Sequence, residues 1–142
     1  MGFEQRNVTR NQSTADYSKS KIFIFDNRFH SGIFKNDTED PLTLRAGMLV
    51  CRDVATPDGL IPATSANLAK VVGIATSTLP ELAADATSTI NYGVKGTVDS
   101  NLIILPATVT FNTTVGSVTL RDFLEGLGFH LEASVENTKF EE

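Results

Sequence analysis

The chain opens with a polar segment and then changes abruptly to an apolar one. Residues 1–20 have no hydrophobic period and are rich in Asn, Gln, Ser and Thr, which predicts a flexible arm. The next stretch, "KIFIFDNRF", contains four consecutive apolar residues of high strand propensity, Ile22, Phe23, Ile24 and Phe25. Because this strand is apolar on both faces, we expect it to be covered on both sides, either by its own domain or by a partner with which the arm pairs.

Apolar and polar residues alternate through "DPLTLRAGMLV", which predicts a half-buried strand. The apolar positions are Leu42, Leu44, Ala46, Met48 and Val50. Gly47 within this strand indicates a bulge or a kink. A turn is predicted at 56–59, where Gly59 tolerates a positive φ. The residues "LIPAT" then predict a short return strand, which Pro62 confines to an edge or an end.

Two more strands are predicted in the middle of the chain. "KVVGIATST" resumes the sheet, and Gly73 within it lets a neighbouring backbone or a bulky ring approach closely. "LPELAADAT" at 79–87 fits either one helical turn or a loop. "TSTINYGVKGTV" alternates again, and its half-buried face holds Ile90, Tyr92, Val94, Gly96 and Val98. The apolar segment "NLIIL" follows and stops at Pro106.

Near the C-terminus the hydrophobic period changes to that of a helix. One helical face is formed by the residues at i, i+3, i+4 and i+7, which are Leu120, Phe123, Leu124 and Leu127. Thr119 is the predicted N-cap, with Asp122 three residues on, and Gly126 and Gly128 are predicted to end the helix. "FHLEASV" then alternates as a closing strand.

These patterns predict a mainly β protein with α+β connectivity: seven or eight short strands and one short helix near the C-terminus. We expect a flexible arm at 1–20, one β-rich domain at 21–135 and a frayed acidic tail at 136–142.

Composition narrows the class of protein further. The chain has 142 residues, 15.3 kDa and 41% hydrophobic residues, which suits one core that needs no disulfide or metal. No apolar run approaches the roughly 18 to 20 residues of a membrane-spanning helix. The N-terminus lacks the apolar core of a signal peptide. We therefore expect a protein that is made in a cytoplasm and has no membrane partner.

Charge is distributed unevenly along the chain. The net charge of −5 argues against a nucleic-acid partner, because duplex binding depends on clustered Lys and Arg. Residues 1–21 nevertheless carry a net +2, which leaves −7 for the remainder. A weakly basic arm on an acidic body suits an arm that docks on another protein, and it equally suits a frayed terminus.

The sequence offers little catalytic equipment. Cys51 is the only cysteine, which excludes an internal disulfide and a multi-cysteine zinc site, and its apolar neighbours predict a small buried side chain. His30 and His130 are the only histidines and lack metal-ligand spacing. No nucleophile elbow and no phosphate-binding glycine loop is present. We expect no cofactor and no metal, and a structural or binding role instead of an enzymatic one.

The stretch "VVGIATSTLPELAADATSTINYGVKGTVDSNLIILP" resembles the head decoration proteins of lambda-like tailed phages. Residues 72–74 match the end of a family strand, 84–89 its small-residue loop, 95–97 the next strand, and 105–106 the apolar segment that closes on proline. Upstream, "LTLRAGMLVCRD" and "DGLIPAT" look like the family's opening strands. Downstream, "TLRDFLEGLGFHLEASV" looks like its short helix and final strand. The resemblance covers roughly residues 42–135, in order and without large gaps.

This resemblance implies a compact β-barrel or sandwich-like fold and a non-enzymatic function. Family members stud the outer surface of the expanded phage head as homotrimers, bind the major capsid protein and stabilise the shell against internal DNA pressure. Their N-terminal arm orders on the capsid and adds a strand to a capsid sheet. The residues that the resemblance assigns to a docking arm are Tyr17, Ile22, Phe23, Ile24 and Phe25, and those with structural roles are Gly73, Gly96 and Pro106.

Two alternatives stay open. The segment "KIFIFDNRFHSGIF" at 21–34 is more apolar than the family's mobile arm, which suits a tail, fibre or other virion component that exchanges this strand between subunits. The other alternative is a small hydrolase whose site forms between subunits around His130 and Asp122.

Overall fold

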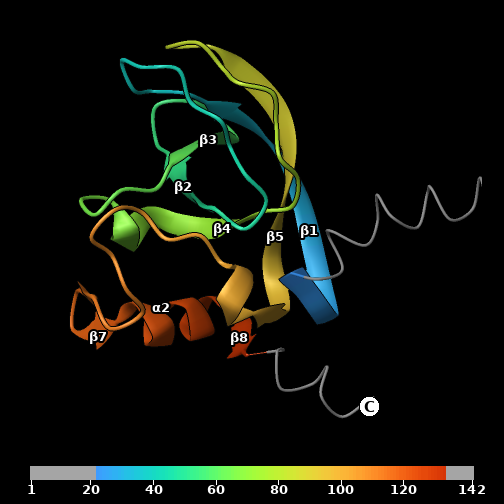
Figure 1. Cartoon of the computed structure of the whole chain (residues 1–142), viewed down its shortest axis with the longest axis vertical. Coiled ribbons are helices and arrows are strands. Elements are labelled where there is room, and N and C mark those ends of the chain that lie inside the picture. The colour runs from blue at the N-terminus through green and yellow to red at the C-terminus, as the bar shows by residue number, and fades with distance from the viewer. Residues whose placement is uncertain (1–21, 134–142) are drawn as a thin grey trace, which may run out of the picture.

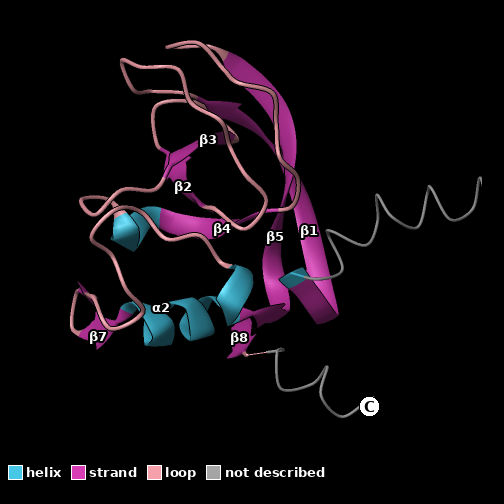
Figure 2. Cartoon of the chain, viewed as in Figure 1, coloured by secondary structure: helices cyan, strands magenta, loops and turns pink. Residues whose placement is uncertain are grey.

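The computed structural model describes residues 22–133, which form a closed five-stranded β-barrel with one short helix near the C-terminal end (Figure 1). This confirms the predicted mainly β class (Figure 2). The strands are β1 (Phe23–Lys35), β2 (Leu49–Asp53), β3 (Gly59–Pro62), β4 (Val71–Ala75), β5 (Thr87–Asp99), β6 (Thr114–Val115), β7 (Val118–Thr119) and β8 (Phe129–Glu132).

The barrel is built on its two longest strands. β1 and β5 pair antiparallel from Phe23–Val98 to Lys35–Thr87 and run side by side along one flank of the molecule (Figure 1). The sheet continues from β1 through β3, β2 and β4 back to β5, which closes the barrel. The β1–β3 pair is parallel, and β8 adds a further parallel strand to the C-terminal end of β5.

The helical segments whose bounds lie within residues 22–133 are η1 (Leu68–Lys70), η2 (Ser100–Leu102) and α2 (Leu120–Leu127). The α2 helix begins as predicted, because the Thr119 side chain accepts a hydrogen bond from the Asp122 backbone N–H at 3.2 Å. It ends at Gly128, whose φ is 120°. The prediction that Gly126 also ends the helix is wrong, since Gly126 lies inside α2.

Two separate cores support this fold. One fills the barrel and is centred on Phe34, Leu44, Val50, Leu60, Ala75, Ile90 and Tyr92. The other contains Ile22 and Phe23, residues of β2, β4 and β5, and the apolar side chains of α2 and β8. It includes Leu120 and Leu124, two of the predicted helix-face residues, which are fully buried. The second core therefore joins the helix to the barrel.

The predicted strand at 42–50 is largely wrong. β2 begins only at Leu49, and the residues before it form an irregular segment with two isolated bridges, Leu42 to Leu82 and Met48 to Ile104. Gly47, with φ of 98°, interrupts the extended chain, and its N–H donates to the Ala75 carbonyl at 2.9 Å. Leu44 and Val50 are nevertheless buried in the barrel. The alternation thus identified two buried residues correctly but not the backbone conformation.

Smaller corrections concern the connecting segments. Asp58, with φ of 57°, takes the left-handed position in the β2–β3 turn that was predicted for Gly59. Of the two alternatives for 79–87, the structure has a loop. The segment before Pro106 contains η2 and a single bridge between Ile104 and Met48, and the Pro106 carbonyl accepts a turn hydrogen bond from the Val109 N–H.

Candidate docking surface on strand β1

Exposed apolar side chains are concentrated on β1. Eight large hydrophobic residues among those described are exposed, and half of them belong to this strand: Ile24, Phe25, Phe29 and Ile33. We name these four the β1 apolar row. Phe25 is 71% exposed, against 39–43% for the other three. Large exposed apolar groups gathered on one element are typical of an interaction surface.

Burial along β1 changes from core to surface directly after Phe23, and residues 24–31 are all exposed. Phe23 is only 3% exposed, and its ring lies against Gly93 on β5, where a Cβ would overlap it. The rings of Phe29 and Phe23 form an edge-to-face pair, with their centroids 5.2 Å apart and their planes at 76°. Phe23 therefore fastens the strand to the barrel, while Ile24 and Phe25 face outward. At the start of β1, the described residues of the chain therefore cover Phe23 but leave Ile24 and Phe25 exposed.

Between these two phenylalanines the strand is bulged. The β1–β5 register shifts between Phe23 and Phe25, again before Arg28, and once more before Phe29. Asp26 has φ of 56°, a left-handed conformation that Asp tolerates better than most residues. Its carboxylate lies 3.5 Å from the Lys95 ammonium group on β5. The bulge thus contacts the neighbouring strand β5.

Gly96 makes room for the bulge from the β5 side. Its φ is 144°, and a Cβ there would collide with the side chain of Asn27. The structural role assigned to Gly96 consequently has a local physical basis, because any larger residue would displace Asn27.

One edge of β1 is only partly paired by the described strands. β3 meets β1 at Ile33 and Phe34, which are ten or more residues from Phe23. Over Phe23–Arg28, β5 is the only described strand that pairs with β1. The irregular register there makes regular strand addition difficult, since bulges and charged residues protect sheet edges from pairing.

The predicted docking residues separate into three groups. Tyr17 lies outside the described residues. Ile22 and Phe23 are buried in the second core, whereas Ile24 and Phe25 are exposed. Sequence reasoning did not name Phe29 and Ile33 as docking residues, although the segment 21–34 that contains them was considered as a strand exchanged between subunits. Their spacing of four along an extended chain was the available signal.

The two residues of the hydrolase alternative lie on different elements, His130 on β8 and Asp122 on α2. His130 on β8 lies 3.2 Å from Glu132, and Asp122 lies in the first turn of α2. No group of three or more His, Cys, Asp or Glu within residues 22–133 is arranged to hold a metal ion. No helix in the same range is long and apolar enough to cross a membrane.

Cys51 is fully buried on β2, as its sequence context predicts. Its thiol lies 3.4 Å from the backbone carbonyl of Asn67 and 3.3 Å from that residue's side-chain oxygen. Burial raises the pKa of the Cys51 thiol to about 12, so the group is neutral at physiological pH.

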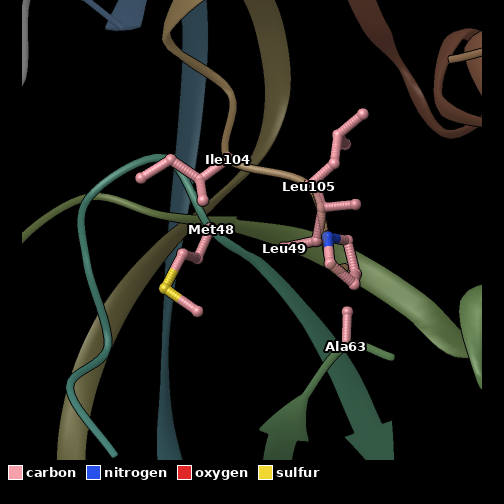
Figure 3. A pocket seen from close by; sticks show the side chains of 6 residues that line it. Met48, Leu49, Ala63, Ile104 and Leu105 are labelled. Carbon is pink, nitrogen blue, oxygen red and sulfur yellow. The ribbon is translucent and has the colours of Figure 1, made fainter. Parts of the chain in front are cut away.

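A small apolar hollow lies between β2 and the segment before Pro106. Met48, Leu49, Ala63, Ile104, Leu105 and Pro106 line it (Figure 3), and its volume is about 30 Å³. Ligand pockets are commonly about 300–1,000 Å³. The hollow has room for a methyl-sized group only, so the β1 apolar row is the stronger candidate site.

No protein-family model matches the chain, and a search of curated proteins finds no match either.

Proposed function

We propose that this protein is a non-enzymatic decoration protein of a phage head, which binds the outer surface of the expanded shell as a homotrimer and stabilises it against internal DNA pressure. The observation that carries the proposal is the β1 apolar row. In the sequence it follows the weakly basic segment 1–21, which is the proposed docking arm.

The fold is compatible with this function in two respects. The segments that resemble the decoration family, roughly 42–135, contribute β2 to β5, α2 and β8 to one barrel with a docked helix. The long antiparallel pairing with β5 also fastens β1 to the barrel. Such pairing suits a cement protein, because a strand that is already folded loses less conformational entropy when it binds two capsomers.

Stabilisation of the shell would follow from mass action. A protein that binds the assembled, expanded state and not the dissociated subunits lowers the free energy of the assembled state. The major capsid protein and further copies of this chain are the proposed partners, and the outer virion surface is the proposed location after synthesis in the host cytoplasm.

Co-sedimentation with expanded, undecorated heads of the source phage tests the proposal. Full-length protein should bind saturably and raise the temperature at which heads rupture, whereas a chain lacking residues 1–20 should bind weakly. Absence of binding by the full chain would contradict head decoration. Labelled imaging that places the protein on tails would favour the tail or fibre alternative.

A further inference from the structure

The geometry points to Phe25 as the anchor of the docking surface, presented by the bulge at Asp26, with the exposed Arg28 three residues further along β1 as the charged contact. The inferred partner site is an apolar hollow that accepts one aromatic ring and carries a carboxylate at its rim. This inference rests on the proposed docking function and specifies which residues of the chain perform it.

Exposure singles out Phe25 within the row. At 71% exposed it leaves most of its ring in water, while Ile24, Phe29 and Ile33 are more than half covered by their own chain. Burying such a ring at an interface recovers more apolar area than burying any other residue of the row. Aromatic and arginine side chains also dominate the binding free energy of most protein interfaces.

The bulge explains why Phe25 is so exposed. Asp26 holds a left-handed conformation, and the register with β5 shifts on both sides of Phe25. On β5, Lys95 pairs with Asp26 at the surface of the bulge, and Gly96 leaves room for the close approach of Asn27. A regular strand would lay the same backbone along β5. The bulge instead reorients the side chain, a common use of bulges at functional sites.

Charge around Phe25 indicates an acidic partner. Arg28 is exposed and forms no ion pair with any of residues 22–133, whereas Lys95 is paired with Asp26. In a chain with a net charge of −5, Arg28 is therefore an exposed positive charge that no described residue neutralises by an ion pair. Complementary charge on the partner would guide and orient the encounter.

The test measures binding of full-length variants to expanded, undecorated heads by co-sedimentation at low and moderate salt. Phe25→Ser should weaken binding at least tenfold, and Arg28→Glu should weaken it and reduce its dependence on salt. Val54→Ser is the matched control, because Val54 is 80% exposed but lies in the β2–β3 turn. It should change binding less than twofold.

A second pair of variants tests the role of the bulge as a positioning element. Asp26→Asn and Asp26→Val both remove the carboxylate that pairs with Lys95, but only Asn readily adopts the left-handed conformation. Asp26→Asn should bind within threefold of the parent chain, and Asp26→Val should lose at least tenfold. Equal binding by these two folded variants would overturn the positioning role. The Phe25 comparison does not depend on how well Asp26→Val folds.

The outcomes separate this inference from the proposed function. If the parent chain binds heads and Phe25→Ser binds equally well, the anchor assignment is wrong while head decoration stands. If the parent chain does not bind, the proposed function fails and the anchor assignment fails with it. Selective loss with Phe25→Ser, alongside normal binding by Val54→Ser, supports both.

Discussion

Gly73 on β4 lies against the ring of Tyr92 on β5. A Cβ at position 73 would stand 2.5 Å from a Tyr92 ring carbon and 2.5 Å from the Gly93 carbonyl oxygen. Tyr92 is itself 3% exposed and belongs to the barrel core. A backbone group and a bulky ring therefore both occupy the space that a side chain at 73 would need.

Replacing this glycine should destabilise the barrel. Gly73→Val is expected to lower the free energy of unfolding by about 1–3 kcal/mol, because the new side chain overpacks against Tyr92 and a backbone carbonyl that cannot easily move. Urea unfolding followed by circular dichroism measures the change. A change within about 0.5 kcal/mol would show that the site relaxes freely.

Gly126 offers the opposite case and a control for the first. It lies inside α2, and a Cβ there would meet nothing within 4 Å. Gly126→Ala should raise the free energy of unfolding by about 0.5–1 kcal/mol, because alanine loses less backbone entropy in a helix. The same urea titration tests this prediction, and a destabilised variant would contradict the position of Gly126 inside α2.

Asn36 connects two loops through a fully buried amide. Its side-chain N–H groups donate to the carbonyls of Asp40 at 2.8 Å and Leu82 at 3.0 Å, and its oxygen accepts from the Thr38 hydroxyl at 2.6 Å. Asn36→Ala should cost about 1–3 kcal/mol, because these partners would lose their hydrogen bonds in a buried site.

Asn112→Ala is the control for this substitution, because Asn112 is exposed. Its effect on the free energy of unfolding should lie within about 0.5 kcal/mol. Thermal unfolding of both variants under identical conditions makes the comparison. Similar midpoints for the two would show that the Asn36 network contributes little to stability.

The raised pKa of Cys51 predicts a loss of stability at alkaline pH. Burial raises the pKa of the thiol from 9.0 to about 12 on folding, so the folded chain holds the proton more tightly than the unfolded chain. The resulting stability is fully present below pH 9 and is lost as pH rises from about 9 to 12. The free energy of unfolding should therefore fall by about 1 kcal/mol between pH 8 and pH 10 because of this group alone.

Comparison with Cys51→Ala isolates the thiol from the other alkaline groups. The variant should have a lower free energy of unfolding at pH 8 because of the cavity, and its decrease between pH 8 and pH 10 should be smaller than in the parent chain. Urea titrations at the two pH values measure the difference. An equal decrease in both proteins would contradict the assignment.

The helix and the predicted strand at 42–50 show how much of the fold could be predicted from the sequence alone. The helix over 120–127 was predictable because its apolar period, its Thr119 cap and its terminal Gly128 are local signals that agree with one another. The strand at 42–50 was mispredicted although its alternation is clean. Gly47 turns the chain there because its N–H bonds to Ala75, a contact made only when β4 is in place.

The same distinction applies to the candidate site. The sequence by itself determined that an apolar, strand-forming segment follows a polar one at residue 22, because β propensity and hydrophobicity are properties of the residues concerned. Only the tertiary structure decided that Phe23 is buried against Gly93 while Phe25 is exposed. That division depends on the bulge at Asp26. Lys95 and Gly96 contact this bulge from β5, a strand about 70 residues further along the chain.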